Sequence, residues 1–379
     1  MGGHMEAAFS KVMVVKIGSS TVTRPDGSVD CDYLANLARQ VACVRAQGWA
    51  VVIVSSGAIA CGLSRLGIER RPTDLPSLQA AASVGQPLFS AAYDEAFAAE
   101  GIATSLVLLT RRDTADRTSY LHARDTLRRL IDFQVVPIVN ENDTVSVEQI
   151  KFGDNDTLGA LVACLLGADL CVVLSDVEGF YDANPATHPD ARLVPRIERI
   201  DAEVLAAAGD AGSSKGTGGM VTKLRAARAL AVAGIPLVIC SGAAADPIVS
   251  VARGDRIGTL FPAAHLPHEI TPRKLWIALG DSSKGSVVVD EGAKRALIER
   301  GSSLLCVGVA CVEGRFSHGD VVDIKDRSGY LFARGHVAFD SDEVELAIGR
   351  TREELAGNRL LKALAVKELV HRDELVVFE

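Results

Sequence analysis

The sequence predicts an α/β fold with a doubly wound, mainly parallel sheet, on the basis of two observations. Short, nearly continuous apolar runs alternate with segments of helical spacing between residues 11 and 252, and buried parallel strands have this uninterrupted apolar character. Glycine and polar clusters follow several of the apolar runs, which is where ligands bind in such sheets. After residue 262 the runs become shorter, which predicts a small, mostly β C-terminal domain.

The first part of the chain supplies the strands and helices of the parallel sheet. The predicted strands are Lys11–Ile17, Ala50–Val54, Ala103–Leu109, Val135–Val139, Leu170–Leu174 and Pro236–Ile239. Apolar residues at helical spacing predict helices over residues 33–47, 77–99, 118–132, 157–166, 220–233 and 246–252. Gly48 is well placed to end the first of these helices. Together these elements predict one domain over residues 6–262.

A linker separates this part from the rest, because prolines at 262, 267 and 272 interrupt residues 263–272. Beyond it, strand-like runs are predicted at Leu275–Ala278, Ser286–Val289, Leu304–Val307, Val321–Ile324 and Tyr330–Ala333. One helix is expected over Glu291–Arg300, and a charged, partly helical tail follows. We therefore expect a second domain over residues 273–364.

Composition narrows the class of protein. The 379 residues are 48% hydrophobic and 23% charged, which is ordinary for a two-domain globular protein. A net charge of −8 argues against broad affinity for nucleic acid or anionic membranes, and no apolar run approaches the roughly 20 residues of a membrane span. The eight scattered cysteines contain no C-x-x-C pair, which favours a reducing, cytoplasmic location over disulfides or a zinc site. Met1–Met5 resembles a vector remnant and is therefore left out of the fold prediction.

A glycine-rich segment, Lys215–Lys223, runs directly into a predicted helix and predicts a phosphate-binding site. Its glycines let backbone N–H groups approach a bulky anion, and the helix that follows directs its positive end to the same place. Its threonines add hydroxyl groups, and Lys223 adds a charge. The alternative is a flexible Gly/Ser surface loop. The segment matches neither the Walker A pattern nor G-x-G-x-x-G.

Lys16 ends the first apolar strand, where a charged residue is normally avoided. Its ammonium either extends to solvent from a buried stem or meets a transferring phosphoryl group beside Gly18. In the second case Lys16 and Lys223 would neutralise this group from two sides. Each unit-charge contact near 4 Å is worth roughly 4 kcal/mol at an effective dielectric of about 20. Phosphoryl transfer depends mainly on such positioning and charge neutralisation.

Polar clusters provide the remaining candidates, each with a structural alternative. In Gly153–Thr157, Asn155 would hold a polar end of the substrate and Asp156 would hold the two lysine ammoniums, or the cluster caps a helix. Asn140–Asp143 suits capture of an ammonium or amide group, or forms an ordinary turn.

Two further clusters follow strands. Ser55–Ala58 offers hydroxyls and amides to a carboxylate, or forms a structural turn. Ser175–Asp182 could contact a nucleoside, or forms a β-turn. No Ser-His-Asp constellation is recognisable.

These motifs together resemble the bacterial glutamate 5-kinases, a branch of the amino acid kinase family, over nearly the full chain. The matching segments are Val14–Ser19, Val54–Ile59, Leu109–Arg111, Tyr120–Leu127, Val139–Val145, Lys151–Asp156, Leu174–Tyr181 and Gly216–Lys223. The segments Val289–Ala293 and Arg300–Leu305 resemble the PUA domain that many of these kinases carry.

The resemblance implies ATP- and Mg²⁺-dependent phosphorylation of the γ-carboxylate of L-glutamate to L-glutamyl 5-phosphate, the first step of proline biosynthesis. Lys16 and Lys223 would stabilise the transition state, and Asp156 would organise them. Glutamate would contact Ser56, Asp143 and Asn155. ATP would contact Lys16, Ser175, Asp176, Thr217, Gly218, Gly219, Met220, Val221, Thr222 and Lys223. Ser175 departs from the threonine of many members but keeps the hydroxyl.

The resemblance also implies feedback inhibition by L-proline and a homo-oligomer, either a dimer or a tetramer. Two alternative functions stay open at this point. One is another acyl-phosphate kinase of the same family, with a different acceptor. The other is an RNA-associated regulatory protein acting through the PUA-like domain, although no basic aromatic platform is present there.

Overall fold

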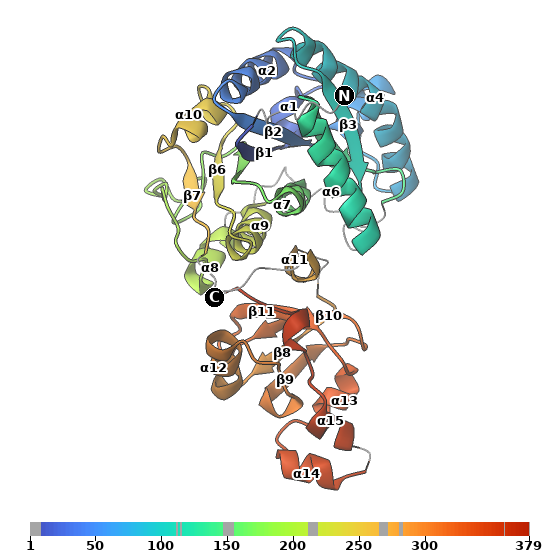
Figure 1. Cartoon of the computed structure of the whole chain (residues 1–379), viewed down its shortest axis with the longest axis vertical. Helices are drawn as coiled ribbons and strands as arrows, with labels where there is room; N and C mark the ends of the chain where they lie inside the picture. The colour runs from blue at the N-terminus through green and yellow to red at the C-terminus, as the bar shows by residue number, and fades with distance from the viewer. Residues whose placement is uncertain are drawn as a thin grey trace, which may run out of the picture. The chain divides into compact units, whose positions relative to one another are not determined.

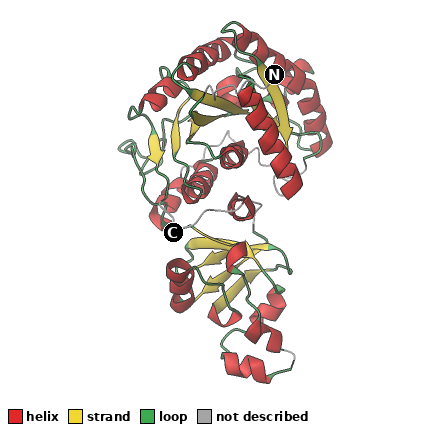
Figure 2. Ribbon diagram, viewed as in Figure 1, coloured by secondary structure: helices red, strands yellow, loops and turns green. Residues whose placement is uncertain are grey.

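Two sheets organise the chain, one in each of the units formed by residues 1–267 and 268–379 (Figure 2). The structure is a computed structural model. It describes residues 9–110, 113, 116–146, 155–210, 219–264, 272–279, 283–359 and 361–378.

The first sheet has seven strands in the order β3-β4-β2-β1-β5-β6-β7. Strands β1 to β6 are parallel, and β7 pairs antiparallel with β6. The mainly parallel, doubly wound sheet is therefore confirmed, and the short edge strand β7 is an addition to the prediction. The strands are β1 Lys11–Ile17, β2 Trp49–Ser55, β3 Thr104–Leu109, β4 Val136–Glu141, β5 Leu170–Ser175, β6 Leu237–Ser241 and β7 Thr259–Phe261.

Helices connect these strands and cover both faces of the sheet (Figure 1). They are α1 Ser19–Val22, α2 Cys31–Arg45, α3 Ala58–Arg65, α4 Leu75–Ala98, α6 Arg117–Asp132, α7 Asn155–Leu166, α8 Ala202–Asp210, α9 Met220–Val232 and α10 Pro247–Arg253. The predicted helices occur within about two residues of their expected bounds, whereas α1, α3 and α8 were not predicted. In the described part of the chain, no helix combines the length and apolar character needed to cross a membrane.

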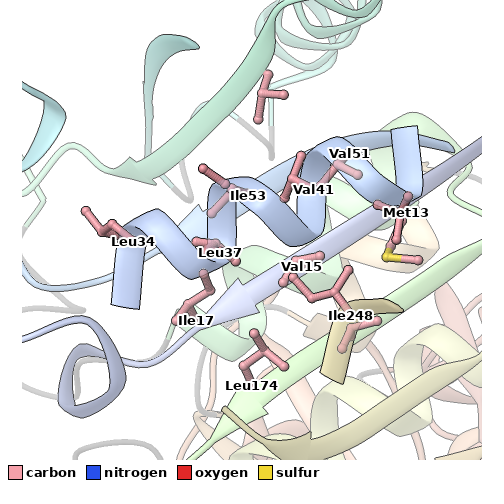
Figure 3. Packing of buried hydrophobic residues seen from close by; sticks show 14 of the residues in the cluster. Met13, Val15, Ile17, Leu34, Leu37, Val41, Val51, Ile53, Leu174 and Ile248 are labelled. Atoms are coloured by element: carbon pink, nitrogen blue, oxygen red, sulfur yellow. The ribbon is translucent and has the colours of Figure 1, made fainter. Parts of the chain in front are cut away.

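Alternate residues of β1 face opposite sides of the sheet, as the strand geometry requires. Met13, Val15 and Ile17 are fully buried in the cluster that packs against α2 and α10 (Figure 3). Lys16 therefore points to the other face, where α7 packs. A Cβ atom added to Gly159 of α7 would lie 3.1 Å from the Cβ atom of Lys16. The absence of a side chain at Gly159 thus leaves space for the stem of the lysine.

Helices α3 and α4 cross in close contact, and glycine makes this possible. A Cβ atom on Gly62 would lie 1.7 Å from the backbone oxygen of Ala81, and one on Gly85 would lie 1.8 Å from that of Ala58. Neither separation leaves room for a side chain. Helix α3 begins directly after Gly57, whose φ of 133° is also accessible mainly to glycine.

The second unit contains a five-stranded sheet in the order β12-β11-β10-β8-β9. Only β8 and β10 pair in parallel. The strands are β8 Gly285–Val289, β9 Val309–Gly314, β10 Val321–Lys325, β11 Leu331–His336 and β12 Leu375–Val377. The helices are α11 Pro272–Leu279, α12 Glu291–Arg300, α13 Ser341–Glu345, α14 Arg352–Gly357 and α15 Lys362–Val366, with 3₁₀ turns at Cys306–Gly308 and Arg372–Glu374.

Two predicted strands of this unit were wrong. Leu275–Ala278 lies in α11, because a short apolar run fits a buried helix as well as a strand. Leu304 forms only an isolated bridge with Val370, and the strand expected at Leu304–Val307 starts at Val309 instead, after a 3₁₀ turn. The predicted tail is also part of the core, since α13 to α15 bury residues within the same hydrophobic cluster as the sheet.

Candidate active site

The predicted polar clusters gather at one edge of the first sheet. Lys16 lies near the end of β1, Ser56 follows β2, Asp143 follows β4, and Ser175 ends β5. These four strands are neighbours and run parallel. Their carboxyl ends therefore share one edge, which is the usual ligand-binding edge of such sheets.

A buried carboxylate holds two lysines at this edge. The Nζ atom of Lys16 lies 2.6 Å from Oδ1 of Asp156, and the Nζ atom of Lys223 lies 3.2 Å from Oδ2. The Asp156 side chain is fully buried, and each lysine side chain is only 7% exposed. The structure thus brings together three residues that are far apart in sequence and were predicted to act together.

Two helix N-termini position this group. Asp156 lies in the first turn of α7 and Lys223 in the first turn of α9, and the two helices pack against each other. The Thr222 hydroxyl lies 3.0 Å from Oδ2 of Asp156 and 2.7 Å from the backbone oxygen of Gly219, so its single proton can bond to either acceptor. The N-terminal end of α9 adds positive potential, which favours an anion.

The electrostatics of the group also favour an anion. Burial alone raises the pKa of the Asp156 carboxyl, but Lys16 and Lys223 outweigh this effect and the net pKa is lowered. The carboxylate is therefore ionised at neutral pH. Together with the two ammoniums it gives a sum of one positive charge, held in a buried place where the field of a charge is strong.

Asn155, the neighbour of Asp156, belongs to a chain of amides. Its Nδ2 atom donates to the backbone oxygen of Ser55 and to Oδ1 of Asn140, both at 3.0 Å. The Nδ2 atom of Asn140 donates in turn to Oε1 of Gln86 at 2.8 Å. The side chains of Asn155 and Asp156 thus bond to other elements of the fold, which is more than a helix cap would require.

Asp143 lies on a cavity of about 720 Å³ between α4, β3 and the segment after β4. Its carboxyl is half-buried, and burial raises its pKa to about 6 although Arg71 acts in the opposite direction. Polar groups from α4, including Ser83 and Gln86, line the same cavity. Apolar surface, including that of Leu106 and Leu108, makes up the larger part of the lining, so the polar groups are localised within it.

Comparison with known families agrees with this geometry. The model of the amino acid kinase family matches residues 11–241. The chain belongs to the amino acid kinase family. The PUA domain model matches residues 285–356, within the second unit.

Curated relatives extend the match to nearly the whole chain. A glutamate 5-kinase from Syntrophotalea carbinolica is 44% identical over 367 residues, which are 97% of this chain and 97% of the relative. A glutamate 5-kinase from Chromobacterium violaceum is 46% identical over 373 residues, which are 98% and 99% of the two chains. A solved isopentenyl phosphate kinase has a TM-score of 0.46 and 22% identity over 66% of this chain and 99% of its own.

Other predicted site residues of this amino acid kinase make further contacts at the same edge of the sheet. Ser175 is buried and donates from Oγ to Oδ1 of Asp176 at 3.0 Å. The backbone N–H of Ser56 donates to the backbone oxygen of Ile17 at 3.3 Å, which ties the segment after β2 to β1. Met220 and Val221 are half-buried in the first turn of α9. Thr217 and Gly218 lie outside the described residues, as do Gly153 and Asp154.

Sequence patterns missed three residues that support the site. Gln86 and Tyr93 belong to α4, which was predicted only as a helix, and Gly159 lies inside a helix predicted only from apolar spacing. The Tyr93 hydroxyl bonds to Oγ of Ser55 at 2.8 Å. A glycine in the middle of an apolar helix was the one available signal, because such a residue often marks a close approach.

Proposed function

We infer that this amino acid kinase catalyses the ATP-dependent phosphorylation of the γ-carboxylate of L-glutamate. The product is L-glutamyl 5-phosphate, the first intermediate of proline biosynthesis. The observation that carries this inference is the buried Lys16–Asp156–Lys223 group, in a chain similar along nearly its whole length to kinases named for this acceptor.

The chemistry fits the residues present. The attacking carboxylate is already ionised at neutral pH, so the reaction requires no general base. The main obstacle is repulsion between this carboxylate and the triphosphate, together with the charge on the oxygens of the transferred group. Lys16 and Lys223 supply two positive charges, each worth roughly 4 kcal/mol near 4 Å at an effective dielectric of about 20. Asp156 keeps both ammoniums in position before the substrates arrive.

We assign the nucleotide to the end of the sheet near β1, β5 and α9. Lys16 and Lys223 would contact the phosphates together with Gly219 and the first turn of α9, and Ser175 and Asp176 would lie beside the nucleotide. Mg²⁺ would neutralise phosphate charge and be held chiefly by phosphate oxygens and water.

We assign glutamate to the end of the sheet near β2 and β4. Ser56 would contact its α-carboxylate, Asp143 its ammonium, and Asn155 the polar end that carries this ammonium. We also propose that L-proline inhibits the enzyme and that the chain forms a homo-oligomer in the cytoplasm. Inhibition of initial rates by L-proline, and light scattering of the purified protein, test these two points.

ADP release coupled to a reporter reaction tests the function. The expected result is release that depends on free L-glutamate, with far less on N-acetylglutamate, aspartate or UMP. Equal or greater release with one of those acceptors would assign the chain to another kinase of the family. The Lys223→Ala variant is expected to lose on the order of 10²–10³ in kcat, as when one transition-state donor is removed. Lys11→Ala, an exposed lysine on the same strand as Lys16, is the control and should retain turnover.

A further inference from the structure

The amide chain that ends at Asn155 has a direction that one backbone group determines. An amide side chain can usually be turned so that its oxygen and nitrogen exchange places. At Asn155 this exchange is excluded, because the backbone oxygen of Ser55 can only accept a hydrogen bond. The atom facing Ser55 must therefore be Nδ2.

The orientation of Asn155 in turn determines which atom donates and which accepts at the next two amides. The second N–H of Asn155 Nδ2 requires an acceptor, so Asn140 must present Oδ1 to it. Asn140 is consequently left with Nδ2 toward α4, where Gln86 must present Oε1. Reversing any one amide would place two donors or two acceptors against each other. Asn140 and Asn155 are 3% and 6% exposed, so water cannot easily replace a lost partner.

This arrangement decides what Asn155 can offer to a ligand. Both N–H groups of its amide are occupied, so Oδ1 is the atom that remains for the substrate. An oxygen acceptor recognises an N–H donor and repels a carboxylate. Asp143, a second oxygen acceptor, lies after the same strand that carries Asn140, and Gln86 lines the same cavity as Asp143.

We propose that Asn140 and Gln86 are positioning residues that hold Asn155 with its carbonyl oxygen toward the substrate, so that the site selects an acceptor bearing a free ammonium. This proposal rests on the proposed function and adds a source for its specificity. Helix packing fixes one end of the chain of amides, because Gly85, next to Gln86, lies against the backbone of Ala58.

The test compares glutamate with glutarate, which has the same two carboxylates and no ammonium. Glutamate affinity is measured as KM, and glutarate affinity as its inhibition constant against glutamate. Gln86→Met removes the acceptor for Asn140, and we expect the KM for glutamate to rise about 2- to 10-fold, the range of one net hydrogen bond. The inhibition constant of glutarate and the KM for ATP should stay within about twofold. Gln86→Glu retains an acceptor oxygen and should restore the KM for glutamate.

Gln40→Met is the matched control. Like Gln86, Gln40 is a glutamine whose Oε1 atom accepts one hydrogen bond, in this case from the backbone N–H of Ile248. It belongs to α2 and is buried against α10, on the other face of the sheet from Lys16. We expect this variant to melt at a lower temperature without a change in the ratio of glutamate to glutarate affinity. A thermal melt of each variant separates loss of folding from loss of selectivity.

Each remaining outcome contradicts the proposal. If Gln86→Met weakens glutamate and glutarate equally, Gln86 serves only packing. If Gln86→Glu is as impaired as Gln86→Met, the N–H of Gln86 contacts the ligand directly. An unchanged KM in Gln86→Met also excludes a positioning role. Failure of the proposed function would appear earlier and separately, as absence of glutamate-dependent ADP release by the unaltered protein.

Discussion

Replacing Asp156 with asparagine is the strongest perturbation of the site. It keeps the shape of the side chain and removes the only negative charge of the Lys16–Asp156–Lys223 group. The two ammoniums, at 2.6 and 3.2 Å from the carboxylate oxygens, would then face each other in a buried place. At these separations and an effective dielectric of about 20, each pair contributes roughly 5–6 kcal/mol of attraction, before the cost of burying the charges is subtracted.

The net loss of stability is smaller than that sum. Removing one partner of a buried ion pair costs about 3–5 kcal/mol, because the remaining charge is left uncompensated. Two uncompensated ammoniums favour the upper part of this range, about 4–5 kcal/mol. For a unit of this size each kcal/mol lowers Tm by about 2–4 °C. We therefore expect Asp156→Asn to lower Tm by roughly 8–20 °C, and to lower kcat by about 10²–10³.

Calorimetry and ADP release measure the two effects. Saturating ATP should raise the Tm of Asp156→Asn more than that of the unaltered protein, because phosphate charge replaces the missing carboxylate. Asp326→Asn is the control, since Asp326 pairs with Lys294 at 2.7 Å in the other unit and should leave kcat unchanged. A variant Asp156→Asn with near-normal Tm and turnover would refute the idea that this carboxylate organises the two lysines.

Three further predictions concern neighbouring groups. The pKa of Asp143 is raised to about 6, so the KM for glutamate should rise as pH falls below about 6, when the protonated carboxyl no longer attracts an ammonium. Because the folded state retains this proton longer, Asp143 also makes stability fall as pH rises from 3.8 to about 6. Asp143→Asn should flatten the KM profile, and a persistent slope in that variant would identify another group. Gly159→Ala would place a Cβ atom 3.1 Å from that of Lys16, so we expect kcat to fall about tenfold or more. Higher helix stability with full turnover, the usual effect of Gly→Ala in an open helix, would contradict the close contact. Tyr93→Phe removes the hydroxyl that lies 2.8 Å from Oγ of Ser55, and urea unfolding should show a loss of about 1–3 kcal/mol. No loss would mean that the bond contributes nothing net.

The sequence predicted the parallel sheet well because uninterrupted apolar runs and helical spacing are local signals. It also predicted that Lys16 and Lys223 would lie close together, on the hypothesis that they neutralise one phosphoryl group from two sides. Asp156 was predicted to hold both ammoniums, and the structure places it in contact with both, whereas the catalytic roles of the three residues stay predictions. The assigned ligand contacts of Ser56, Asp143 and Ser175 stay predictions, because their roles depend on ligands.

The remainder depends on packing that no local pattern encodes. Gln86 is one polar residue on a long helix, and only the crossing of α3 and α4 places it beside Asn140. Leu275–Ala278 failed for a different reason, since four apolar residues fit either kind of element. Periodicity thus identifies the elements, whereas the partners of a polar side chain follow from tertiary contacts.

The contact between Gly62 and Gly85 has a consequence for how this enzyme can vary. Any larger residue at either position separates α3 from α4. Ser56 lies two residues before the start of α3, and α4 carries Gln86, so we expect such a substitution to displace both residues together. A substitution at Gly62 or Gly85 would therefore change the packing of the two helices and the position of the predicted glutamate-binding residues at the same time. Evolution cannot alter one of these properties at these two positions without altering the other.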